Sequence, residues 1–95
     1  MTWRPPLGSG LGGEFGEART TAPVRFERSR AASRSSYQSA DGTGGTVWVD
    51  ARNSSGEVPP VGSLVTVDGG DEMVVREVRQ YHVRGDLHHT ELVVA

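Results

Sequence analysis

Two adjacent histidines near the end of the chain are the residues best suited to chemistry. His88 and His89 are followed by Glu91, and imidazole and carboxylate groups are ligands that zinc accepts in proteins. Neighbouring residues of a strand point to opposite faces, so His89 and Glu91 should share a face while His88 points away from both. A zinc site needs further ligands, and His82 is the only other histidine. We therefore expect His88 and His89 to be structural residues, with no metal and no cofactor.

Other motifs of catalysis or recognition lack the context that they need. The serines have no Gly-x-Ser-x-Gly elbow around them, and no cysteine is present as a nucleophile or metal ligand. Residues 8–13 are as glycine-rich as a dinucleotide-binding loop, but no strand pattern precedes them and no helix pattern follows. The tripeptide Arg84-Gly85-Asp86 is one that integrins recognise, and a turn explains its glycine. The sequence therefore favours a protein that is not an enzyme.

The one cluster of basic residues predicts a contact with a polyanion or with a neighbouring subunit. Arg28, Arg30 and Arg34 lie in or beside a polar, serine-rich stretch, where guanidinium groups could bind DNA phosphates. The alternatives are ion pairs with acidic residues of the next subunit, or a solvated loop. Residues 1–40 carry a balance of +3 and residues 41–95 a balance of -5. Such asymmetry suits copies that join end to end, or a basic part placed near a polyanion.

Residues 1–19 are predicted to be an extended arm. Five glycines and a Pro-Pro pair exclude a stable helix or strand. Four apolar residues recur at every fourth position, as in a helical stripe, but the glycines between them disfavour a helix. We expect these side chains to dock on a neighbouring molecule, with the tryptophan as the main anchor. The four are Trp3, Leu7, Leu11 and Phe15.

Residues 20–95 are predicted to form one all-β domain, a small antiparallel β-barrel. Short alternating or valine-rich runs separated by glycine turns are typical of such a fold, and a long polar connection spans residues 29–45. No apolar run approaches the roughly 20 residues that span a membrane. The expected strands cover residues 20–28, 46–52, 63–67, 72–80 and 87–94, although residues 72–80 also show helical i,i+4 spacing. The expected core consists of Val47, Val49, Leu64, Val67, Val74, Val78, Leu92 and Val94.

The order of short motifs in residues 45–95 resembles a known family. The likeness begins with Gly45-Thr46-Val47-Trp48-Val49-Asp50 and a Pro-rich loop, continues through residues 61–69 and 74–78, and closes on Tyr81 and Leu87-His88-His89-Thr90-Glu91. This series is similar to the head-closure, or stopper, proteins of tailed phages, which are minor capsid proteins of the head-tail connector. Thr90 stands where that family would have an aromatic residue.

The resemblance implies a structural virion protein. It implies a β-barrel subunit whose copies form a ring, expected to be twelve-fold, beneath the portal or adaptor protein. The ring would close the DNA-filled head and offer the surface to which a tail protein attaches, with packaged double-stranded DNA passing through its channel. Such a protein belongs to the virion neck, is assembled in the host cytoplasm and contacts no membrane. Tyr81, His88 and His89 would be structural residues of the barrel.

The alternative is a free-standing nucleic-acid-binding β-barrel of the OB type. Such modules place aromatic stacking residues along a basic groove. Tyr37, Trp48 and Tyr81 are the candidates here. The region that holds them is acidic, which disfavours this interpretation.

Overall fold

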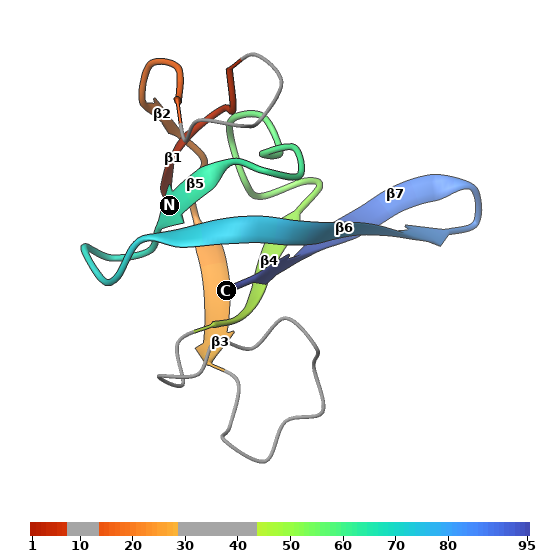
Figure 1. The fold of residues 1–95 in the computed structure, drawn as a ribbon. Helices are drawn as coiled ribbons and strands as arrows, with labels where there is room; N and C mark the ends of the chain where they lie inside the picture. Colours follow the sequence, from red (N-terminus) through yellow and green to blue (C-terminus); the bar gives the residue numbers. More distant parts are fainter. Residues whose placement is uncertain (8–13, 29–43) are drawn as a thin grey trace.

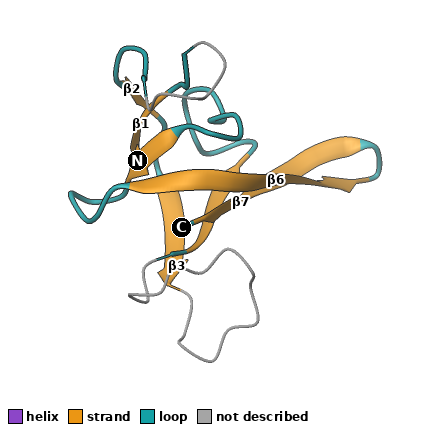
Figure 2. Cartoon of the chain, viewed as in Figure 1, coloured by secondary structure: helices purple, strands orange, loops and turns teal. Residues whose placement is uncertain are grey.

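Seven β-strands make up the part of the chain that the structure describes, and no helix is present there (Figures 1 and 2). The structure is a computed structural model, and it describes residues 1–7, 14–28 and 44–95. The all-β class predicted from the sequence is confirmed. Since these residues contain no helix, none is long and apolar enough to cross a membrane. The strands are β1 (Thr2–Arg4), β2 (Arg19–Thr20), β3 (Val24–Arg28), β4 (Gly45–Asp50), β5 (Leu64–Thr66), β6 (Met73–Val83) and β7 (Asp86–Val94).

All seven strands belong to one antiparallel sheet with the order β2-β1-β5-β6-β7-β4-β3. The predicted closed barrel is wrong, because no ladder joins the described edge strands β2 and β3. These two strands follow one another along the chain and are separated only by residues 21–23. They therefore continue each other end to end and do not pair side by side. The outcome is an open sheet that curls around one core (Figure 1).

Strand β6 joins the two halves of this sheet. Its first residues pair with β5 and its later residues pair with β7. A register shift between Val75 and Glu77 leaves Arg76 as an extra residue, which is a β-bulge. Because a bulge resets the alternation of faces, Met73 and Val75 are buried before it, and Val78 packs against the core after it.

The core is made of apolar residues from both halves of the sheet. Five of the eight predicted core residues are buried: Val47, Val49, Val67, Leu92 and Val94. Leu64 and Val74 are only half-buried, because β5 and the start of β6 turn the alternate residues inward. Val78 is half-buried where it packs against the core after the bulge. The prediction missed five buried residues: Met1, Trp3, Val65, Met73 and Val75.

The first four residues belong to the folded domain, which corrects the prediction of an arm. β1 pairs with both β2 and β5, and Trp3 is 1% exposed. The indole Nε1–H of Trp3 donates to the hydroxyl of Thr21 at 3.0 Å, and that hydroxyl donates to the carbonyl of Glu57. A three-residue strand beside a Pro-Pro pair is too short to recognise by its alternation. Trp3 is therefore a core residue of its own chain, and the single chain buries it without a neighbouring molecule.

The chain on either side of the glycine-rich run closes into a narrow loop. Backbone hydrogen bonds join residues 5–7 to residues 14–16. Leu7 is 48% exposed at this place, and Phe15 is half-buried. Leu11, the remaining residue of the predicted arm, lies outside the described residues. The paired backbone of this segment departs from the extended arm that we expected.

The predicted polar connection leads from β3 to β4. β3 ends at Arg28 and β4 begins at Gly45, so the last residue of that connection belongs to the sheet. Only glycine fits at position 45, because a Cβ there would collide with the carbonyl of Glu27 and the ring of Phe26 across the ladder. Residues 29–43 lie outside the described part of the chain.

Candidate functional site

The β6–β7 hairpin extends beyond the rest of the sheet as a two-stranded ribbon (Figure 1). The last pair between β4 and β7 is Asp50 with His89. From there to the turn, β6 and β7 pair only with each other among the described strands. Arg84 and Gly85 have φ values of 52° and 85°, the left-handed geometry of two-residue hairpin turns. The Arg84-Gly85-Asp86 tripeptide is thereby explained as a hairpin tip.

This ribbon, residues 81–89, carries apolar side chains that its own domain leaves open. Tyr81 is 40% exposed, Val83 53% and Leu87 37%. In the described part of the chain, only Leu7 and Val61 are comparable large apolar residues. Exposed apolar groups that gather on one projection mark contact surfaces, and a two-stranded hairpin is marginally stable alone in water. The ribbon is therefore the best candidate for a surface that another molecule covers.

A second bulge brings the two histidines together at the base of the ribbon. Tyr81 pairs with His89 and His82 with Leu87, so His88 is an extra residue of β7. The extra residue breaks the alternation of faces on which the sequence prediction depended. The Nδ1 atoms of His88 and His89 lie 2.8 Å apart. The prediction that these imidazoles point away from each other is therefore wrong.

His89 is held by three neighbours on the outer face of the sheet. Its Nε2 lies 2.9 Å from a carboxylate oxygen of Glu91, and the ring of Tyr81 stacks on it at 4.8 Å between centroids. An ionised carboxylate only accepts hydrogen bonds, so His89 donates from Nε2. When His89 is neutral, its Nδ1 accepts the Nδ1 hydrogen of His88. These contacts fix the side chains at the point where the ribbon leaves the sheet, and neither imidazole lies in the core.

Metal ligation finds no support in the geometry of these histidines. Among residues 1–7, 14–28 and 44–95, no three His, Cys, Asp or Glu side chains are grouped to hold a metal ion. His82 lies farther along the ribbon and is exposed. That His88 and His89 act only structurally stays a prediction, which metal analysis of the untagged protein would test.

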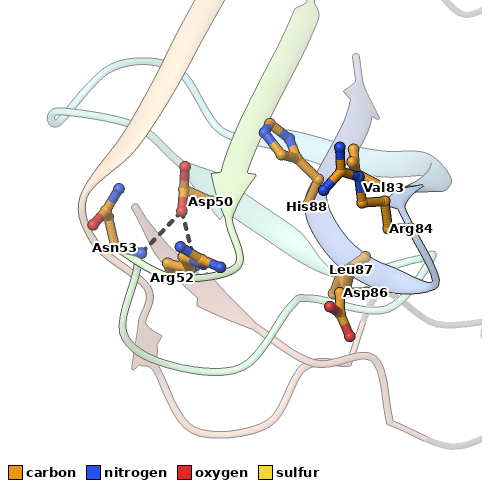
Figure 3. A pocket seen from close by; sticks show the side chains of 8 residues that line it. All are labelled: Asp50, Arg52, Asn53, Val83, Arg84, Asp86, Leu87 and His88. Carbon is orange, nitrogen blue, oxygen red and sulfur yellow. Dashed lines mark hydrogen bonds between the residues drawn. The ribbon is translucent and has the colours of Figure 1, made fainter.

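A cleft of about 480 Å³ lies between the ribbon tip and the loop that follows β4 (Figure 3). Val83 and Leu87 line it from the ribbon. On the loop side, the carboxylate of Asp50 accepts hydrogen bonds from the backbone amides of Asn53 at 2.9 Å and Arg52 at 2.8 Å. These bonds, that of Asn53 above all, lower the pKa of Asp50 because they favour its charged form. The Asp50 carboxylate is thus engaged in holding its own loop.

A shallower hollow surrounds Trp48 on the outer face of β3, β4 and β7. The guanidinium of Arg25 lies 5.2 Å from the centre of the Trp48 ring and 3.6 Å from the carboxylate of Glu27. Farther across the sheet, Arg79 forms an ion pair with Glu77 at 3.0 Å. This pairing raises the pKa of Arg79 and lowers that of Glu77. Since carboxylates offset both arginines, this face has little attraction for phosphate.

The arginines predicted to contact DNA or a neighbour are not part of the ribbon. Arg28 is exposed at the end of β3, the edge strand farthest from β6 on that side of the sheet. Arg30 and Arg34 lie outside the described residues. Of the predicted structural residues, Tyr81 and His89 stack on each other.

The sequence did not lead us to predict Val83 and Leu87 as residues of a contact surface. A usable signal was present, because Val83 directly precedes a two-residue turn of the kind that closes a hairpin and Leu87 lies two residues after it. The length of β6 was not readable from the sequence. Its 11 residues far exceed the three of its neighbour β5, so most of β6 has no partner on that side among the described strands.

Comparison with known proteins leaves the family of this chain open. No family model, no curated protein and no solved structure matches it. The function must therefore be argued from the residues and their arrangement.

Proposed function

We propose that this chain is a structural subunit of the head-tail connector of a tailed phage. Copies form a ring below the portal or adaptor, close the DNA-filled head and receive the tail. The observation that carries the proposal is the projecting ribbon, on which Tyr81, Val83 and Leu87 are exposed. Apolar surface held in water gives a solitary protein no stability, whereas a subunit buries it against its neighbours. The resemblance of residues 45–95 to head-closure proteins supplies the particular assembly.

Size and charge support an assembled state. A domain of 95 residues buries a smaller share of its surface than a larger one and gains from contacts between subunits. The basic balance of residues 1–40 and the acidic balance of residues 41–95 suit subunits that meet head to tail. Neutralised arginines on the outer face suit a channel wall, because a channel should let DNA pass without binding it tightly.

Arg28, Arg30 and Arg34 are assigned in this proposal to the channel or to a neighbouring subunit. If they contact phosphate, removal of each arginine should reduce the salt slope of duplex DNA binding by about 0.9. If the wild-type protein shows no salt-dependent retention on duplex DNA, the phosphate contact is rejected and the subunit contact remains.

One observation favours the alternative of a nucleic-acid-binding module. Trp48 and Tyr81 lie on the same outer face, since Trp48 and Asp50 share a face and Asp50, His89 and Tyr81 occupy one row of the ladder. Aromatic rings on a sheet face can stack with bases. The ion-paired arginines beside them weigh against binding. Quenching of tryptophan fluorescence by a single-stranded oligonucleotide at physiological salt would support this alternative over the ring.

Negative-stain imaging of the purified chain, alone and mixed with portal and adaptor proteins of the same virion, tests the proposal. We expect discrete rings seated beneath the portal. Val83→Ser should reduce the number of rings. Val61→Ser is the matched control, because Val61 is exposed to a similar degree, 56% against 53%, and lies outside the ribbon. Absence of rings in every mixture would reject the proposed function.

A further inference from the structure

The two ends of β6 carry features that fit each other but cannot meet within one molecule. The hairpin turn lies at one end and the turn between β5 and β6 at the other (Figure 1), and the cleft lies beside the hairpin turn. That turn contains Asp68, Asp71 and Glu72, all of them exposed. None of the three takes part in an ion pair in the part of the chain that the structure describes. The turn therefore presents three carboxylates that no described residue neutralises.

The shape of this turn is that of a narrow projection. Asp68 and Gly69 have φ values of 50° and 72°, which reverse the chain over a few residues. A Cβ built at Gly69 would have no atom within 4 Å. The apex of the turn is consequently thin and free on its outer side.

The cleft carries two arginines that can bind carboxylates, Arg52 and Arg84, and its lining also holds Asp50 and Asp86. Arg52 and Arg84 line it from opposite sides, one on the loop and one on the ribbon (Figure 3). Neither forms an ion pair with a described residue. The carboxylate of Asp50 is turned to its own loop by the amides of Arg52 and Asn53. Guanidinium groups bind carboxylates with charge-assisted hydrogen bonds, and the exposed apolar groups of the ribbon are beside them.

We infer that the acidic β5–β6 turn of one copy, residues 68–72, occupies the cleft of the next copy. Arg52 and Arg84 bind its carboxylates, and the ribbon covers the turn with Val83 and Leu87. Each copy then has one cleft and one turn at opposite ends, so the contact is head to tail and repeats until the ring closes. This inference rests on the proposed ring function and identifies the surfaces that the ring would use.

Disulfide trapping tests this contact without background, because the chain contains no cysteine. Asn53→Cys lies in the cleft and Asp71→Cys in the turn, and the two single variants are mixed under mild oxidation. We expect a mixed dimer that joins Cys from one variant to Cys from the other, and few dimers of either variant alone. Val61→Cys mixed with Asp71→Cys is the control and should give no such dimer. Dimers of Asn53→Cys with itself would overturn the inference in favour of a two-fold contact.

Imaging of the same preparations separates this inference from the proposed function. Rings that form without the mixed dimer overturn the inference and leave the connector role intact. Mixed dimers in open filaments, without rings in any mixture, uphold the contact and reject the connector role. Loss of both overturns both.

A charge exchange gives a second readout that does not need oxidation. Arg84→Asp keeps the turn, since Asp-Gly is a preferred hairpin dipeptide, but it should weaken self-association on the order of fivefold. Adding Asp71→Arg to the same chain should restore most of the affinity. Arg76→Asp, an equal charge change on an exposed residue outside the cleft, is the control and should have little effect. If Arg76→Asp weakens association as much as Arg84→Asp, the contact is not at the cleft.

Discussion

The two halves of the β6–β7 hairpin belong to one ladder but differ in burial. Toward the end of β7, Leu92 and Val94 are buried against the core. Toward the turn, Tyr81, Val83 and Leu87 are exposed large apolar residues of the same hairpin. Strand pairing therefore continues well beyond the buried side chains that stabilise the hairpin. This difference indicates that the inner half of the hairpin serves the fold and that the outer half serves a contact with another molecule.

Trp3→Ala should have the largest effect on the buried half. Trp3 is 1% exposed in the core that Leu92 also enters, and truncation of a buried aromatic residue costs about 3–5 kcal/mol. Urea unfolding at pH 7 measures the loss. A loss below about 1 kcal/mol would show that Trp3 contributes little to this core. It would support the prediction from sequence that Trp3 anchors the chain on a neighbouring molecule.

Gly85→Ala should act on the ribbon alone. Gly85 has a φ of 85°, and a side chain in the left-handed region costs roughly 1–2 kcal/mol. If the outer half opens independently of the core, native-state hydrogen exchange should accelerate in residues 81–89 and stay unchanged at Leu92. Equal acceleration at both places would mean that the hairpin opens as one unit.

Asp50→Ala should destabilise the loop at the base of the ribbon in a pH-dependent way. The folded protein lowers the pKa of Asp50 below its ordinary value of 3.8, so its charged form contributes stability above that value. This contribution is lost as the pH falls through the lowered pKa. The difference in unfolding free energy between wild type and variant should therefore be present at pH 7 and shrink below the ordinary carboxyl range. A pH-independent difference would contradict this assignment.

Val83→Ser and Leu87→Ser should change the stability of the isolated chain least. Exposed residues outside special sites usually contribute within about 0.5 kcal/mol. Thermal unfolding at low protein concentration would measure this. A loss above about 1.5 kcal/mol would show that the ribbon is covered by its own domain and would remove the contrast between the two halves.

The sequence predicts the all-β class and places the main strands of the described second half, because valine-rich runs between glycine turns have few other interpretations. It does not predict the bulges at Arg76 and His88. Each bulge inserts one residue without a local signature, and each changes which side chains share a face. The buried Met73 and Val75, and the contact of His88 with His89, follow from these two insertions.

The N-terminal segment could not be predicted for a different reason. Trp3 is placed by pairing with β5, some sixty residues later in the chain, and a local pattern contains no such information. The exposure of the ribbon is likewise a property of the whole sheet. It depends on the short length of β5 and on the last pair of β4 with β7, at Asp50 and His89.

Hydrogen exchange of the wild-type chain, dilute and in the assembled state, tests the central claim most directly. The amides of residues 81–89 should exchange quickly in the dilute chain, because this part of the hairpin opens locally. In the assembly they should slow by about tenfold or more, while the amides of Leu92 and Val94 stay protected in both states. Equal exchange of residues 81–89 in the two states would show that the ribbon is not the contact surface.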